Sequence, residues 1–262
     1  MKHLRLHIEN ELATLTLNNP PQNRIGTPML EDFEEAVESI ANSGVRALII
    51  RADGPDFSYG GYFPEWPGMK THELRALFDR YLAVYNRFER LPFPTMAAVQ
   101  GACWGGGFEL AIRCDMIIAA PSAHFNHPEQ TLAITTLLGG VYRLAERAGR
   151  NIAAEMAYTS GQLDAEKMHR HGVVNRIVPE KDLDKEVLLL ASSLAHGATR
   201  AHAAHKVLLR LWALGGIQAA DEALMDVSVP LFETEDTERA LQSAEIALAK
   251  GEKRPVLQFK GR

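Results

Sequence analysis

The stretch GACWGGGFELAIRCD, residues 101–115, places three consecutive glycines directly before an apolar segment that contains one glutamate. A glycine inside a helix costs about 0.8–1 kcal/mol relative to alanine, so Gly105, Gly106 and Gly107 need a compensating role. A glycine-rich turn that opens a helix leaves backbone N–H groups free and lets a ligand approach them closely. Such a turn suits a phosphate or the negative oxygen that forms on a carbonyl during a reaction. Tight packing between strand and helix is the structural alternative.

Two common phosphate-binding patterns do not fit these glycines. No Lys-Ser/Thr pair follows them, as a P-loop requires, and GGGFEL lacks the alternate glycines of the dinucleotide fingerprint. A second glycine-rich loop, Phe57-Ser-Tyr-Gly-Gly-Tyr-Phe63, follows an expected strand at 45–50 much as the first motif follows one at 96–99. Two such strand ends can together provide two N–H donors to one developing negative oxygen.

Two glutamates are close to these motifs in the sequence. Glu109 occupies the apolar run 108–112, where a charge is costly to bury, and Glu129 belongs to a His-Pro-Glu-Gln tetrapeptide. Two acids that reach the same reacting atoms can divide the work, one deprotonating water and the other delivering a proton. Each glutamate alone also fits an ordinary acidic residue in the first turn of a helix. His124 and His127 flank Glu129 and are candidate bases or tuning residues.

The pattern of apolar residues predicts an α/β body followed by a helical tail. Period-two alternation predicts a hairpin at 4–8 and 13–17, and further strands are expected at 45–50, 96–99, 115–120 and 173–178. Helices are expected at 30–40, 71–91, 141–159, 188–195, 203–214, 217–227 and 238–249, the first of them capped by Thr27 before Pro28. The helical tail suggests a packing or oligomerisation element.

Composition excludes several classes of protein. The net charge of −5, from 28 basic and 33 acidic residues, argues against a nucleic-acid binder. No run approaches 18 apolar residues, so no membrane span is expected, and the first 17 residues lack the apolar core of a signal peptide. Cys103 and Cys114 are too few for a disulfide framework, and no metal site is expected. We therefore expect a soluble protein of the reducing cytoplasm.

The order of the motifs resembles the enoyl-CoA hydratase/isomerase (crotonase) superfamily. The matching segments are LNNP with NRI, FSYGGYF, GACWGGGFELAIRCDMIIA, AHFNHPE, GGVYRLAER and the C-terminal KRPVLQFKG. The resemblance implies a crotonase-like spiral of repeated ββα units over residues 1–195, which carries the active site. It also implies a helical oligomerisation region over 196–262. Members usually form trimers or paired trimers, so a homotrimer or homohexamer is expected.

The resemblance also implies the residues of the site. The oxyanion donors correspond to the backbone N–H groups of Gly61 and Gly106, and the two hydratase glutamates correspond to Glu109 and Glu129. Contacts with coenzyme A are expected from the loop residues and the C-terminal lysine, namely Arg24, Ile25, Gly60, Gly61, Tyr62, Phe63, Pro64, Gly106 and Lys260. Lys260 corresponds to a lysine that often meets the coenzyme A phosphates of a neighbouring subunit. No separate cofactor is expected, because coenzyme A is part of the substrate.

The expected reaction is hydration of an α,β-unsaturated acyl-CoA, with Glu109 activating water for attack at Cβ and Glu129 protonating Cα. Three alternatives remain open: double-bond isomerisation, cleavage of a β-diketone without coenzyme A and assisted by histidine, and a catalytically idle or RNA-binding relative. The sequence departs from the family pattern at Tyr62, where aspartate is common, and at Trp104, where a smaller residue is usual. It departs again at Asn126-His127 before Pro-Glu, and at Leu137-Leu138 before the glycine pair.

Overall fold

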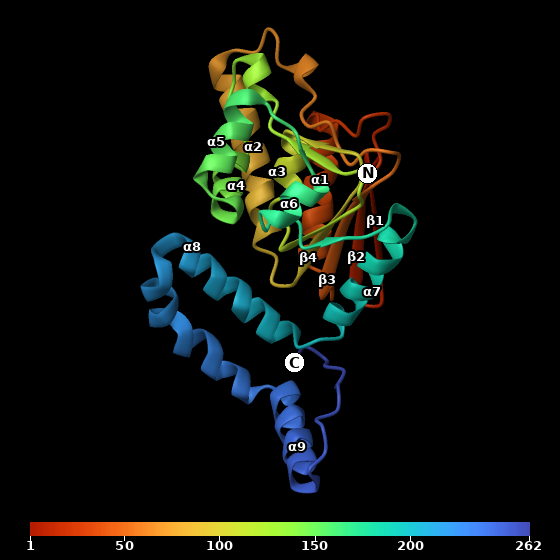
Figure 1. Ribbon diagram of the computed structural model, residues 1–262, viewed down its shortest axis with the longest axis vertical. Coiled ribbons are helices and arrows are strands. Elements are labelled where there is room, and N and C mark those ends of the chain that lie inside the picture. The colour runs from red at the N-terminus through yellow and green to blue at the C-terminus, as the bar shows by residue number, and fades with distance from the viewer.

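Six strands form the main sheet of the protein, whose computed structural model describes residues 1–262 (Figure 1). In order across the sheet they are β1 (Leu4–Glu9), β2 (Leu12–Leu17), β3 (Ala47–Ala52), β4 (Thr95–Val99), β6 (Met116–Ala119) and β9 (Arg176–Ile177). β1 and β2 pair as an antiparallel hairpin, and every other neighbouring pair is parallel. The hairpin and the strands expected near 45–50, 96–99 and 115–120 are therefore confirmed.

A second sheet consists of three short strands, β5 (Ala102–Trp104), β7 (His124–Asn126) and β8 (Leu163–Asp164). β5 follows β4 along the chain and β7 follows β6, so each of these two turns of the chain contributes one strand to each sheet. The segment after β3 joins the second sheet at a single residue, Ser58, which pairs with β5. The Ser58 N–H donates to Ala102 O at 2.9 Å, and the Trp104 N–H donates to Ser58 O at 2.9 Å. The expected α/β spiral of repeated ββα units is thus confirmed.

Nine α-helices and four short 3₁₀ helices complete the fold. The α-helices are α1 (Thr27–Ala41), α2 (Thr71–Glu89), α3 (Gly106–Ala111), α4 (Gly140–Ala148), α5 (Arg150–Thr159), α6 (Ala165–Arg170), α7 (Leu183–Ala195), α8 (Thr199–Ser228) and α9 (Glu235–Lys250). The 3₁₀ helices are η1 (Phe63–Glu65), η2 (Glu129–Leu132), η3 (Glu180–Asp182) and η4 (Val229–Glu233).

The central strands of the main sheet, β2, β3, β4 and β6, are buried on both faces. Successive residues of β3 point to opposite faces, so Leu48 and Ile50 join the larger core with α1 and α2, whereas Ala47 and Ile49 face the other way. On that other face they pack in the smaller core that contains the buried face of α7. Burial on both sides explains why the sequence of β3 is apolar without alternation.

The structure differs from the sequence expectations at several boundaries. The helix expected at 141–159 is two helices, because Gly149 adopts a positive φ of 87° between α4 and α5. The glycine motif follows the short strand β5, and the strand expected at 173–178 is reduced to β9. Gly26 is the N-cap of α1, and the Thr27 hydroxyl donates to Glu65 Oε2 at 2.8 Å. The three-stranded sheet was not expected, because its strands are only two or three residues long.

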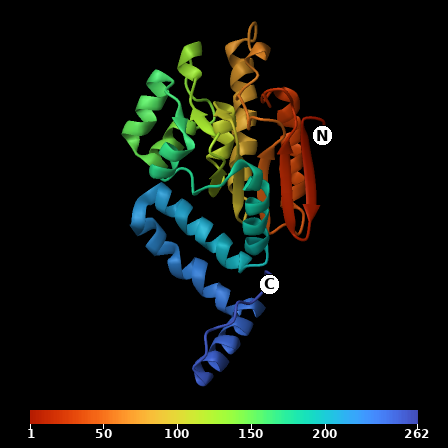
Figure 2. The same cartoon turned by 45° about the vertical axis from the view of Figure 1, so that its right-hand side comes forward.

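The C-terminal helices α8 and α9 project away from the body (Figures 1 and 2). Inside α8 the backbone of Gly216 is not helical, with φ 73° and ψ −168°, so the two segments expected at 203–214 and 217–227 meet there. Large apolar side chains of this region are exposed, among them Leu209, Trp212, Leu214, Ile217, Met225, Phe232 and Leu248. No helix is both long and apolar enough to span a bilayer. The division at residue 195 and the cytoplasmic location stay predictions.

Candidate active site

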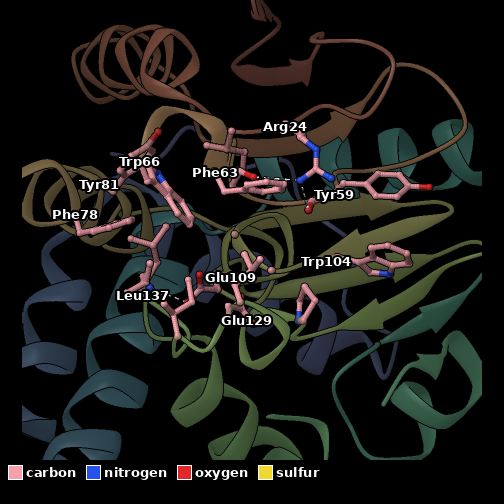
Figure 3. A pocket seen from close by; sticks show the side chains of 18 of the residues that line it. Arg24, Tyr59, Phe63, Trp66, Phe78, Tyr81, Trp104, Glu109, Glu129 and Leu137 are labelled. Atoms are coloured by element: carbon pink, nitrogen blue, oxygen red, sulfur yellow. Dashed lines mark hydrogen bonds between the residues drawn. The ribbon is translucent and has the colours of Figure 1, made fainter. Parts of the chain in front are cut away.

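A cavity of about 240 Å³ opens where the loops after β3, β5 and β7 converge (Figure 3). Aromatic and aliphatic side chains make up most of its wall, and two carboxylates interrupt it. The lining residues are Arg24, Ile25, Tyr59, Gly61, Phe63, Trp66, Phe78, Tyr81, Trp104, Gly105, Gly106, Glu109, Pro128, Glu129, Thr131, Leu132, Ile134, Leu137 and Leu138. A mostly apolar cavity with a few convergent polar groups is typical of a small-molecule site.

Two glycine turns meet at this cavity. A Cβ atom added to Gly60 would lie 3.0 Å from the backbone nitrogen of Gly106, and one added to Gly106 would lie 3.5 Å from the backbone nitrogen of Gly61. The two amides are therefore close neighbours. The Gly61 N–H donates to no protein acceptor, and Gly106 is the first residue of α3, where N–H groups lack an intrahelical acceptor. Two adjacent N–H groups without acceptors can bind one negative oxygen.

Glu109 is the buried carboxylate of the cavity, with 2% of its surface exposed. Its Oε1 accepts the N–H of Leu138 at 2.7 Å and the N–H of Gly140 at 2.9 Å. Burial raises the pKa of Glu109, and the nearby charge of Glu129 raises it further. A carboxylate whose pKa is raised is a stronger base than a solvated one, which helps it to take a proton from water.

The loop that holds Glu109 is itself held by two arginines. Arg113 Nη2 donates to Leu138 O at 2.7 Å, and Arg143 Nη1 donates to Gly139 O at 3.2 Å. Both guanidinium groups also donate to Glu89, at 2.6–2.7 Å. Burial alone would raise the pKa of Glu89, but the hydrogen bonds from Arg143 and the charge of Arg113 lower it. Glu89 therefore stays ionised as the anchor of both arginines.

Sequence reasoning missed this support. Arg113 lies within the motif that drew attention to Glu109, and its side chain is completely buried. A basic residue at the end of the apolar segment 108–112 is the signal that could have revealed a buried ion pair, since buried charges are almost always paired. The partner, Glu89, is 24 residues away in the sequence, and only the fold brings the two together.

Glu129 lies at the start of η2 and lines the same cavity as Glu109. Its side chain is 12% exposed. A Cβ atom added to Gly105 would lie 3.2 Å from Glu129 Oε1, so this oxygen faces the glycine turn. The sequence-predicted pair of carboxylates therefore lines one cavity together with both glycine turns, as Figure 3 shows for the two labelled glutamates.

Two groups of aromatic residues flank the glutamates (Figure 3). On one side the Arg24 guanidinium lies over the rings of Tyr59, at 5.8 Å, and Phe63, at 5.5 Å. On the other side Trp66 contacts Phe78 edge-on, with 5.5 Å between ring centroids. The cavity thus has one end with a cation and another lined mainly by the aromatic rings of Trp66, Phe78 and Tyr81.

The other residues singled out in the sequence do not line the cavity. Gly60, Tyr62 and Pro64 belong to the same loop as Gly61 but lie outside the wall, and Tyr62 is 44% exposed. Lys260 lies on a separate groove between the body and the C-terminal helices, where its N–H donates to Asp236. Its expected contact with a neighbouring subunit stays a prediction.

Neither candidate histidine reaches the cavity wall. His124 lies 5.6 Å from the ring of Trp104, and its Nδ1 is 3.0 Å from Ser122 O. His127 is buried behind Glu129, with Nδ1 at 3.7 Å from Glu129 Oε2. Trp104 itself packs edge-on against Tyr59, at 4.7 Å between centroids, and lines the cavity without separating the glycine turns.

A ββα spiral that surrounds two carboxylates and two adjacent free amides defines an enzyme of the crotonase type. Residues 7–245 match the sequence profile of the enoyl-CoA hydratase/isomerase family. The chain therefore belongs to this family, and the resemblance found in its motifs is confirmed.

Individual relatives match over most of the chain. A short-chain-enoyl-CoA hydratase of Clostridium acetobutylicum is 30% identical over all of this chain and 99% of its own length. A crotonyl-CoA hydratase of Syntrophomonas wolfei is 32% identical over 74% of this chain and 75% of its own length. The crystal structure of an enoyl-CoA hydratase from Bacillus anthracis is 25% identical, with a TM-score of 0.88 over 99% of this chain and 100% of that one.

Proposed function

We propose that this enzyme adds water across the α,β double bond of an acyl-CoA thioester. The observation that carries the proposal is that Glu109, Glu129 and the amides of Gly61 and Gly106 line one cavity. Two carboxylates suffice to move both protons of a hydration, and two amides suffice to bind the oxygen on which negative charge develops. The named activities of the Clostridium and Syntrophomonas relatives support the same reaction.

The thioester carbonyl accepts hydrogen bonds from the N–H groups of Gly61 and Gly106. Glu109 takes a proton from water as the water oxygen bonds to Cβ, and the C=C π electrons move toward the carbonyl as an enolate. Glu129 then protonates Cα, which restores the thioester. Glu109 Oε1 is occupied by two backbone N–H groups, so Oε2 is the oxygen available to the water.

The two ends of the cavity bind different parts of the substrate. The coenzyme A portion enters past Arg24, Ile25 and Phe63, where the cation meets its phosphates. The acyl group lies toward Trp66 and Phe78, whose rings exclude water from the double bond. An end lined mainly by aromatic rings suits a hydrocarbon acyl chain.

Hydration of crotonyl-CoA by the purified enzyme tests the proposal. We expect turnover of the wild type, and a fall in kcat of at least about tenfold for Glu109→Gln and for Glu129→Gln. Thermal unfolding of both variants controls for folding. If neither substitution slows turnover tenfold, the assigned roles are wrong.

Isomerisation needs one carboxylate to carry one proton, so a cavity lined by two carboxylates favours hydration. Exchange of substrate protons with deuterated solvent, without a hydrated product, would instead select isomerisation. Cleavage of a β-diketone would need an imidazole at the reacting atoms, and neither His124 nor His127 lines the cavity. Turnover of a diketone without any binding of a CoA ester would overturn that argument.

We also propose that copies of the chain assemble, as trimers or paired trimers, through the region 196–262. Support comes from the exposed apolar side chains of α8, η4 and α9, which water solvates poorly. In the assembly Lys260 meets the coenzyme A phosphates bound by a neighbour. Analytical ultracentrifugation at micromolar concentration should give a trimer or hexamer, and Lys260→Ala should raise KM without changing kcat. A monomer that retains full activity contradicts both statements.

A further inference from the structure

The imidazole of His127 is completely buried and has no hydrogen-bond partner in the protein. Its exposed fraction is 0%, and both Nδ1 and Nε2 are unpaired. The ring packs on the ring of Phe108, with 4.9 Å between centroids and 33° between planes. A neutral imidazole has one N–H donor and one acceptor nitrogen, so burial removes hydrogen bonds to water that nothing in the protein replaces. A group of this kind in a native structure calls for an explanation.

Glu129 provides a matching unpaired acceptor. Its Oε2 is buried, has no hydrogen-bond partner and lies 3.7 Å from His127 Nδ1. A hydrogen bond from a nitrogen to a carboxylate is about 2.7–2.9 Å long, so an approach of roughly 1 Å would pair the two atoms. The second oxygen of Glu129, Oε1, faces the glycine turn at Gly105. One carboxylate oxygen therefore faces the histidine and the other faces the cavity.

The opposite edge of the ring lies beside the other carboxylate. A Cβ atom added to Gly140 would lie 2.9 Å from His127 Nε2, 2.3 Å from Cε1 and 2.8 Å from Glu109 Cγ. Gly140 therefore makes room for the imidazole between the two glutamates and also donates its N–H to Glu109. The titratable groups that face His127 are Glu129 at Nδ1 and Glu109 on the Nε2 edge.

We propose that His127 is a positioning residue for Glu129, with Nδ1–H donating to Oε2 so that Oε1 is directed toward the substrate. This proposal rests on the proposed function. When Glu129 is protonated, Oε2 accepts the Nδ1–H bond and the acidic proton stays on Oε1. When Oε1 gives that proton to Cα, the same bond stabilises the resulting carboxylate. Because His127 does not line the cavity, it acts through Glu129 and does not touch the substrate.

Three substitutions separate this role from simple packing. The amide nitrogen of asparagine is as far from Cβ along the side chain as Nδ1 of histidine, whereas that of glutamine corresponds to Nε2. We expect His127→Leu and His127→Gln to lower kcat for crotonyl-CoA about tenfold with KM unchanged, and His127→Asn to keep kcat within about threefold. His124→Asn, three residues earlier at the start of β7, is the matched control and should leave kcat unchanged. The proposal is overturned if His127→Leu keeps kcat within twofold, or if Asn rescues no better than Gln.

A spectroscopic readout keeps the test independent of turnover. With ¹⁵N-labelled histidine, NMR should show His127 as the Nδ1–H tautomer, and Glu129→Gln should shift that signal because the acceptor changes. An Nε2–H tautomer, or a signal insensitive to Glu129→Gln, overturns the proposal even if the variants are poorly active. Conversely, a Glu129→Gln enzyme with undiminished kcat contradicts the proposed function of Glu129. In that case the NMR measurement of the tautomer alone decides whether His127 donates to Glu129.

Discussion

Arg113 and Glu109 are joined through a single residue, Leu138. The Leu138 N–H donates to Glu109 Oε1 at 2.7 Å, and Leu138 O accepts from Arg113 Nη2 at 2.7 Å. Glu109 and Arg113 are four residues apart in the sequence. The end of α3 and the residues just beyond it therefore bind the loop 137–140 at both the N–H and the carbonyl oxygen of Leu138. A carboxylate that must meet a water molecule within a fraction of an ångström depends on such support.

Replacing Arg113 with methionine should therefore impair catalysis without touching the cavity wall. Methionine fills much of the space of the arginine stem but leaves Leu138 O without its donor, so the loop that holds Glu109 relaxes. We expect kcat for crotonyl-CoA to fall about tenfold, about 1.4 kcal/mol in the barrier, with a small change in KM. Steady-state kinetics measure both.

Arg147→Met is the matched control for Arg113→Met. Arg147 is a half-buried arginine, and its Nη2 donates to Cys114 O, away from the loop 137–140. Both variants should lose stability, because each loses a hydrogen bond from a guanidinium group to a backbone carbonyl. Only Arg113→Met should lose kcat, and equal losses in the two variants would show that general destabilisation is responsible.

Glu109→Gln should stabilise the folded protein as it inactivates it. Glutamine keeps an oxygen that can accept from Leu138 and Gly140 but carries no charge into the buried site. Because the pKa of Glu109 is raised by burial and by Glu129, the native state binds its proton more tightly than the unfolded chain. The stability from this group is present below its ordinary pKa of 4.5 and is lost as pH rises through the native pKa.

Thermal unfolding as a function of pH checks the direction of this pH dependence of stability. The Tm of Glu109→Gln should equal that of the wild type near pH 4 and exceed it increasingly toward pH 7. Each kcal/mol of relief raises Tm by about 2–4 °C for a chain of about this size. A wild-type enzyme more stable than the variant at pH 7 would mean that the carboxylate is solvated well enough to carry its charge freely.

The candidate residues of the cavity could be predicted from the sequence because glycine turns and acids in apolar runs leave local signals. Glu109 in an apolar run, and glycines at two strand ends, marked the candidate site, and the order of the motifs, which resembles the family, assigned roles to the two glutamates. The residues that support Glu109 left no such signal in the sequence. Glu89 and the loop 137–140 meet Arg113 only through tertiary packing, and the three-stranded sheet is too short for periodicity to reveal. Local sequence patterns thus predict the glutamates and glycines that line the cavity. The residues that hold them in position are known only from the fold.

Phe78 should limit the length of the acyl group. Its ring stands at the apolar end of the cavity and contacts Trp66. Phe78→Leu enlarges that end, and a methylene accommodated in a hydrophobic pocket is worth about 1–3 kcal/mol. We expect kcat/KM for a six-carbon enoyl-CoA to rise about tenfold relative to crotonyl-CoA. Phe63→Leu, at the Arg24 end, should change KM for both substrates equally, and a shift in their ratio there would reverse the proposed orientation.

Gly106→Ala is the sharpest test of the paired amides, because the fold tolerates the methyl group while the chemistry does not. Its nearest neighbour would be the Gly61 nitrogen at 3.5 Å, an ordinary contact, so Tm should change little. The methyl group would occupy the space between the two N–H donors, and we expect kcat/KM to fall about 10²–10³-fold, as when an oxyanion donor is lost. At Gly107 the added Cβ would lie 2.5 Å from Ser58 Cβ, so Gly107→Ala should instead destabilise the fold. A stable Gly106→Ala enzyme with full activity would mean that the substrate oxygen binds elsewhere.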